Sequence, residues 1–352
     1  MRLRLCWPCG LAAAWVLAGL ASAQEPAPGP GEDPAPLMIE ETPEALPDAD
    51  GRQPAPAIAQ VISPEETRWR ETIRKGLAAQ EQRDFVKAEE IFRAALAQAE
   101  QFQPDGELAA MSQMRLGIFF RALGRWQDAE PFYARAVETM KKARGPEHQY
   151  AAVYMDNLTR LYQVLRRYEE AEKVGREALA IFEKSLGAEH PQVAVSLSNL
   201  AEICRALKKD QEAVTFYERA AAIQEKALGA AHPLLAGTLN SLGLLCLEQR
   251  DPERARQYCG RAAAIFEKAR GPEHTDVAVS LRCLGHACLA ARDYAPAHAA
   301  LARALAIHEK KYGPEHRSLV PLLRLCGQAL RGLGRVGEAE ILEGRAKKIE
   351  ER

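Results

Sequence analysis

The sequence predicts an all-α protein in which pairs of helices stack side by side into a solenoid. A phrase of glycine, two further residues and histidine recurs every 42 residues, at Gly145, Gly187, Gly229, Gly271 and Gly313. Between these phrases, apolar residues fit two amphipathic helices in each period. Small residues also recur at one register of each helix. A fixed period of this length is typical of repeat architectures, which grow by adding units rather than by enlarging one core.

Residues 187–228 illustrate one unit. The first helix carries apolar residues at positions i, i+3, i+4 and i+7, which share one face: Leu197, Leu200, Ala201 and Cys204. A polar stretch at 208–210 interrupts the pattern and marks a turn. A second helix follows, with a face of Ala213, Tyr217 and Ala220. We expect glycine to end this helix at Gly229, and proline to begin the next one at Pro233.

The small residues mark where the two helices of a pair approach closely. In the first helix they are Gly76, Gly117, Thr159, Ala201, Gly243, Gly285 and Gly327. In the second helix they are Ala88, Ala129, Ala171, Ala213, Ala255, Ala297 and Ala339. A bulky side chain at these positions would push the helices apart. The register predicts seven helix pairs, with approximate bounds 64–102, 103–144, 145–186, 187–228, 229–270, 271–312 and 313–352.

The residues that precede the repeats have a different composition. Residues 1–23 are predicted to be a secretory signal peptide, because an apolar run follows Arg2 and Arg4 and ends in a small-residue cleavage pattern, Ala21-Ser22-Ala23. Residues 24–63 contain nine prolines, and eight acids against one base, which predicts a disordered and extended linker. We therefore expect an exported protein, periplasmic in a bacterium or secreted, with no membrane insertion after cleavage.

Charge and motifs argue against two classes of function. The formal net charge is −1, without the basic surplus that nucleic-acid binders usually carry. The sequence has no nucleophile elbow, no phosphate-binding loop and no His-Glu-x-x-His motif. We therefore expect a protein that is not an enzyme, uses no cofactor and does not bind nucleic acid.

The repeated histidines are not expected to hold a metal ion. Equivalent residues of stacked helix pairs lie roughly 10 Å apart, whereas zinc ligands must converge within about 2.3 Å of one ion. We interpret these histidines as packing residues of the loops and helix starts. Cys283 and His286 share a helix face, but two ligands do not make a site. Cys246 and Cys259, in the two helices of one unit, are the disulfide candidate, since an exported protein meets an oxidising compartment.

The repeat resembles the tetratricopeptide repeat, in the 42-residue form known from kinesin light chains. The resemblance covers about residues 64–352. It rests on the small residue of the first helix, the leucine before it, the alanine of the second helix and phrases such as Arg167-Tyr168-Glu169-Glu170-Ala171-Glu172. It implies a right-handed superhelix whose first helices line a concave groove that holds peptides. The polar residues that then point into the groove are Asn157, Arg160, Asn199, Glu202, Asn240, Arg282, His286 and Arg324.

These expectations favour an exported, non-enzymatic scaffold that holds a protein or peptide in its groove. Two alternatives stay open. One is an envelope protein that assembles through its ends or outer surfaces. The other is an accessory subunit of an enzyme complex.

Overall fold

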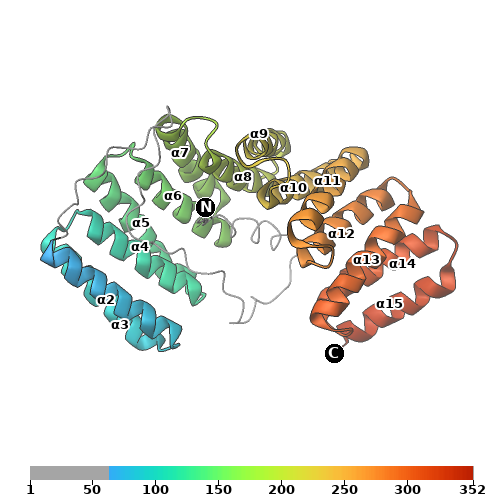
Figure 1. Ribbon diagram of the computed structural model, residues 1–352, viewed down its shortest axis with the longest axis horizontal. Coiled ribbons are helices and arrows are strands. Elements are labelled where there is room, and N and C mark those ends of the chain that lie inside the picture. Colours follow the sequence, from blue (N-terminus) through green and yellow to red (C-terminus); the bar gives the residue numbers. More distant parts are fainter. Residues whose placement is uncertain (1–62, 352) are drawn as a thin grey trace, which may run out of the picture. The chain divides into compact units, whose positions relative to one another are not determined.

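The computed structural model describes residues 63–351, and all of the regular structure in that range is helical (Figure 1). The helices are α2 Pro64–Glu81, α3 Phe85–Phe102, α4 Glu107–Ala122, α5 Trp126–Arg144, α6 Gln149–Val164, α7 Tyr168–Leu186, α8 Pro191–Ala206, α9 Asp210–Leu228, α10 Pro233–Glu248, α11 Pro252–Arg270, α12 Thr275–Ala290, α13 Tyr294–Tyr312, the 3-10 helix η1 Arg317–Leu319, α14 Val320–Gly332 and α15 Val336–Glu350. They form seven pairs, as predicted, so the all-α repeat solenoid is confirmed; the superhelical sense stays a prediction. The predicted signal peptide and nearly all of the predicted linker lie outside the described residues.

The chain divides into two compact units after Gly187. The described part of the N-terminal unit holds α2 to α7, and the C-terminal unit holds α8 to α15. The even-numbered helices are the first helices of their pairs, and the odd-numbered helices are the second helices. Within each unit, a first helix packs against its own second helix and against the second helix of the preceding pair. None of the helices in 63–351 is long and apolar enough to cross a membrane.

Where the small residue of the first helix is glycine, it makes room for one side chain of the second helix. A Cβ atom added to Gly76 would lie 2.5 Å from the Phe92 ring, and one added to Gly285 would lie 2.4 Å from Leu301. Gly117 packs in the same way on the ring of Tyr133, at 3.1 Å. The predicted close approach of the two helices is therefore confirmed in these pairs.

The repeated histidines cap the first helices. The Nδ1 atoms of His148, His190, His232 and His274 each accept a hydrogen bond from the backbone N–H two residues later, at 3.1 to 3.2 Å. His316 makes the same bond at the start of η1. A cap of this kind satisfies one of the N–H groups that the first turn of a helix leaves without a partner. The glycine of each phrase ends the preceding helix with a φ of 88 to 98°, in the left-handed region that glycine tolerates best. The phrase therefore acts as a helix stop followed by a helix start.

The turn inside most pairs places a residue with a Cβ atom in the left-handed region. Lys208 has a φ of 60°, and the equivalent positions are Arg83, Arg166, Arg250 and Arg292. Gly124 and Gly334 stand at this position in the second and seventh pairs. Glycine adopts this conformation without the steric cost that other residues bear. Five of the seven turns therefore bear a steric cost that glycine would avoid.

The predicted disulfide between Cys246 and Cys259 is wrong. Cys259 of α11 is bonded to Cys283 of α12, with their Cα atoms 5.8 Å apart, and Cys246 is a buried free cysteine. The reason is the antiparallel register of α10 and α11. Cys259 lies opposite Gly243, where an added Cβ would meet its Sγ at 2.3 Å. Cys246 lies almost one turn further along α10 and packs on Ala255 instead.

Candidate binding surface on the first helices

The N-terminal unit brings together two of the predicted groove residues, Asn157 and Arg160, on α6. The Nη2 atom of Arg160 donates to Oδ1 of Asn157 at 3.0 Å, and Nδ2 of Asn157 donates to the Val153 carbonyl oxygen at 3.0 Å. Asn157 is thus held by its own helix. The Nε atom of Arg160, by contrast, is shielded from solvent and has no hydrogen-bond partner.

Two further arginines from α4 lie in the same region. Arg115 is buried, with 5% of its surface exposed, and Arg121 is half-buried. The Nε atoms of both are shielded from solvent and lack hydrogen-bond partners. Burial lowers the pKa of Arg115. Burial also lowers the pKa of Arg160, which the nearby Asp156 carboxylate opposes and the Arg121 guanidinium reinforces.

These arginines act electrostatically on the phenol of Tyr133, a fully buried residue of α5. Burial raises the pKa of Tyr133, and the positive charges of Arg121, Arg160 and Arg115 oppose that rise. The hydroxyl makes no hydrogen bond of normal geometry, although Arg121 lies beside it. Three arginines therefore act on one phenol, and the Asp156 carboxylate acts on Arg160.

In the C-terminal unit, the predicted groove residue Glu202 has its partners within the protein. Its Oε1 accepts hydrogen bonds from the Tyr217 hydroxyl and, at 3.2 Å, from Ser241. Its Oε2 pairs with Arg205 at 2.9 Å, and Arg205 also reaches Glu248 of α10. Burial and the Glu202 carboxylate raise the pKa of Tyr217, so the phenol stays a hydrogen-bond donor. This arrangement is a closed network.

Asn240 is not on an accessible surface. It is 1% exposed, and its Nδ2 donates to the Ser280 hydroxyl of α12 at 2.8 Å. First helices α10 and α12 contact each other here, so the asparagine joins two helices. Asn199 is half-buried on α8. Asn240 shows that a polar residue at the predicted groove register can be buried and hydrogen-bonded within the protein instead of facing a ligand.

The remaining predicted residues lie near the C-terminal end of the array. Arg282 is half-buried on α12, and burial lowers its pKa. His286 is exposed on the same helix, and partial loss of water together with the Arg282 charge lowers its pKa. Arg324 is paired with Glu350 at 2.6 Å. It lines an open hollow of about 530 Å³ with Gln328, Glu343, Lys347 and Glu350.

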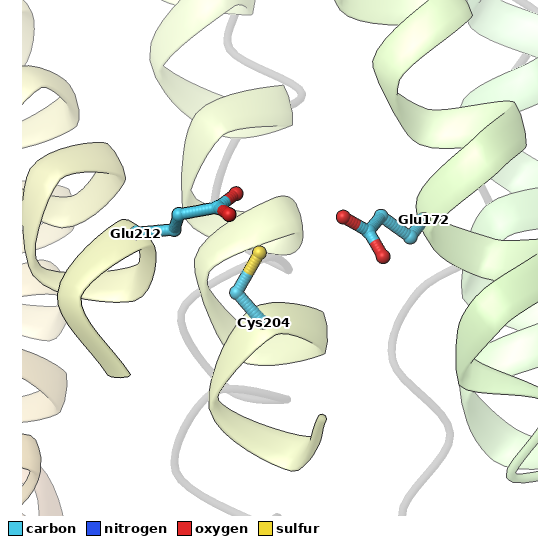
Figure 2. A group of neighbouring side chains, drawn as sticks. All are labelled: Glu172, Cys204 and Glu212. Carbon is cyan, nitrogen blue, oxygen red and sulfur yellow. The ribbon is translucent and has the colours of Figure 1, made fainter. Parts of the chain in front are cut away.

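The cysteines and histidines have structural roles. Cys283, which shares a face with His286, is bonded to Cys259 and has no free thiol. The Nδ1 atoms of the repeated histidines accept hydrogen bonds from the backbone. Figure 2 shows Cys204 on α8 and Glu212 on the first turn of α9, together with Glu172 of α7. Glu172 pairs with Arg176 on its own helix. The three residues come from two units, and we assign no metal site to them.

The sequence interpretation missed Arg115, Arg121 and Tyr133 as site residues. Arg115 stands at the register of Asn157 and Asn199, 42 and 84 residues before them. Placing the second helix pair in the same register would therefore have found it. The convergence of three arginines on one phenol depends on how α4, α5 and α6 pack, which no single helix pattern reveals.

Comparisons with known proteins agree with the geometry. A family model described as tetratricopeptide repeat matches residues 108–184, 160–226, 192–258 and 234–310. A crystal structure of BtubC (BKLC) from P. vanneervenii is similar, with a TM-score of 0.53 and 22% identity, over 69% of this chain and 91% of that chain. A kinesin light chain with nearly identical TPR-like repeats from Podosopora anserina has a TM-score of 0.52 and 27% identity, over 58% of this chain and 97% of that chain. PilW, a type IV pilus biogenesis factor, has a TM-score of 0.51 and 16% identity, over 68% of this chain and 92% of that chain. No curated protein sequence matches this one.

Proposed function

Because the chain belongs to the tetratricopeptide repeat family, whose fold implies a protein–protein interaction scaffold, we propose that it is an exported, non-enzymatic scaffold that holds a protein or peptide partner against its first helices. The observation that carries the proposal is the set of buried polar groups that the first helices leave without partners. Buried polar atoms are normally hydrogen-bonded, so such a set calls for an explanation, and a partner that packs against these helices is the one that we propose. On α4 and α6 these atoms are the Nε atoms of Arg115, Arg121 and Arg160.

The second helices offer a different kind of surface. Their exposed charges are mostly paired with each other along the array, as in Arg254 with Glu218, Arg261 with Glu225 and Arg303 with Glu267. Exposed pairs of this kind contribute about 0–1 kcal/mol each and are satisfied without a ligand. The first helices are therefore the better candidate for the binding face.

Export is the second part of the proposal, and the N-terminal sequence supports it. A charged start, an apolar run and a small-residue end are the three features of a cleaved signal. The test is the N-terminal sequence of the protein purified from the extracytoplasmic fraction of its host. A mature protein that begins at Gln24 agrees with export and cleavage. An intact Met1 in the cytoplasmic fraction contradicts them.

The binding face is tested by partner retention. The variant Asn199→Ala with Arg282→Ala removes two half-buried polar groups from α8 and α12. We expect at least one protein that co-purifies with the wild type after crosslinking in the native compartment to be lost from this variant. Lys226→Ala, which removes an exposed ion pair between α9 and Glu189 of the loop before α8, is the matched control and should retain every partner. If the double variant retained all partners, the binding face would lie elsewhere.

A further inference from the structure

The disulfide bond of the C-terminal unit joins two different helix pairs. Cys259 lies on α11, the second helix of the fifth pair, and Cys283 lies on α12, the first helix of the sixth pair. Both side chains are buried, with 0% and 3% of their surface exposed. The bond is therefore a covalent link across the interface between two neighbouring repeats.

The two sulfur atoms lie where three helices meet. A Cβ atom added to Gly243 of α10 would lie 2.3 Å from Sγ of Cys259 and 3.2 Å from Sγ of Cys283. Helices α10 and α12 are also joined directly, by the hydrogen bond from Asn240 to Ser280 at 2.8 Å. The disulfide thus holds α12 against both helices of the fifth pair.

The equivalent positions at the neighbouring interfaces of this unit carry larger side chains. These positions are also 24 residues apart, as the two cysteines are. Between the fourth and fifth pairs they are Tyr217 and Ser241, whose hydroxyl groups both donate to Glu202. Between the sixth and seventh pairs they are Leu301 and Leu325, which pack in one hydrophobic cluster. Two free thiols would bury less surface than either combination, so we expect the reduced interface to be the weakest of the three.

The sixth and seventh pairs depend on this interface for their attachment to the rest of the unit. In a repeat array, each pair is stabilised by its own fold and by its contacts with its neighbours. The helices α12 to α15 meet the preceding pairs mainly through α10 and α11. When the disulfide is broken, these four helices can open while α8 to α10 stay folded. The intact bond opposes such opening because it restricts the conformations of the opened chain.

We propose that the bond between Cys259 and Cys283 is a redox switch that controls the opening of α12 to α15. In the oxidised protein these helices stay packed on the fifth pair, and in the reduced protein they open independently of α8 to α10. The switch closes when the two thiols give two electrons and two protons to a disulfide such as oxidised glutathione, which leaves as two thiols. It opens when a dithiol reduces the S–S bond to two thiols and itself becomes a disulfide.

The switch also acts on the proposed binding face. Helix α12 carries Arg282 and His286, so the redox state determines how firmly these residues are held in place. An exported protein meets an oxidising compartment, where the switch is closed. This consequence rests on the proposed function, whereas the switch itself is a property of the array and is tested without a partner.

The test is hydrogen exchange of the purified full chain, followed by mass spectrometry. One sample is oxidised with oxidised glutathione, and the other is unfolded in urea with dithiothreitol and refolded with this dithiol present. We expect amide protection in α12 to α15 to be roughly 30- to 300-fold lower in the reduced sample, and protection in α8 to α10 to be unchanged. Cys246→Ala removes a buried free cysteine of the same pair, keeps the bond and should show the same difference as the wild type. Cys259→Ala with Cys283→Ala should show no difference between the two treatments.

Three results would overturn the proposal. Equal protection of α12 to α15 in the two wild-type samples would show that the bond does not control their opening. An equal loss of protection throughout α8 to α15 would show that the unit opens as a whole. The absence of a peptide pair linked through Cys259 and Cys283 in the oxidised sample would remove the bond itself. The wild-type samples alone decide these outcomes, so the comparison stands even where the double variant does not fold. None of them bears on the scaffold, which the co-purification experiment tests separately.

Discussion

The histidine caps make the stability of the array depend on pH. His148, His190 and His232 accept a backbone hydrogen bond through Nδ1, which is possible only while that nitrogen is unprotonated. Burial lowers the pKa of all three, and Arg144 lowers that of His148 further. A folded-state pKa below the unfolded value means that the unfolded chain binds protons first. The stabilisation is therefore complete above the unfolded pKa of about 6.5 and is lost as pH falls below it.

The size of the effect follows from proton linkage. At pH 5.5, an unfolded histidine with a pKa of about 6.5 gains about 1.4 kcal/mol from protonation, if the folded form stays neutral. Three such caps give an upper limit of about 4 kcal/mol between pH 7.5 and 5.5. The perturbation is the triple variant His148→Asn, His190→Asn and His232→Asn. Asparagine is a good N-cap and does not titrate in this range.

The assay is urea unfolding followed by circular dichroism at the two pH values. We expect the wild type to lose up to about 4 kcal/mol more than the triple variant on acidification. His298→Asn, inside α13 and not at a cap, is the control and should behave as the wild type does. An identical pH dependence of the wild type and the triple variant would refute the capping role.

Three further predictions concern stability. Cys283→Ser should destabilise the oxidised protein by about 3.5 kcal/mol, because the disulfide closes a loop with a sequence separation of 24, and an equal effect of the substitution in reduced protein would contradict it. Gly285→Ala should cost about 1–3 kcal/mol in urea unfolding because its Cβ would meet a leucine of α13 at 2.4 Å, whereas Gly344→Ala on α15 has open space and should not destabilise. Lys208→Gly should raise the free energy of unfolding by about 0.5–1 kcal/mol, since it relieves a left-handed residue; a lower midpoint would show that the lysine side chain contributes more than the strain costs.

The sequence predicts the fold well because the information repeats. Helix ends, small residues and core faces each occur several times at one period, so errors at single positions do not matter. The turn at 208–210, the proline starts and the close approach at Gly76 and Gly285 all agree with the structure. The role of the repeated histidine was predicted only as packing at the helix start, since a ring nitrogen accepting from the backbone depends on one rotamer.

The binding surface is less predictable because it depends on pairs of neighbouring helices. Asn240 was expected to face a ligand, and it bonds to Ser280. The disulfide prediction failed for the same reason, since the partner of Cys259 comes from the next pair. The electrostatic effect of Arg115 on Tyr133 likewise depends on the packing of α4 against α5. The alignment of the two helices within one pair could be predicted from the sequence. The contacts between neighbouring pairs could not, because they depend on how the pairs pack.

The central claim, that partners bind the first helices, is tested most directly by placing a photo-crosslinking amino acid at two positions of the N-terminal unit. Val153 lies on α6, one turn before Asn157, and is 37% exposed. Arg135 lies on α5, where its side chain is 63% exposed. After irradiation in the native host, we predict adducts with other proteins from Val153 and few or none from Arg135. Adducts from Arg135 alone, or equally from both positions, would contradict the account.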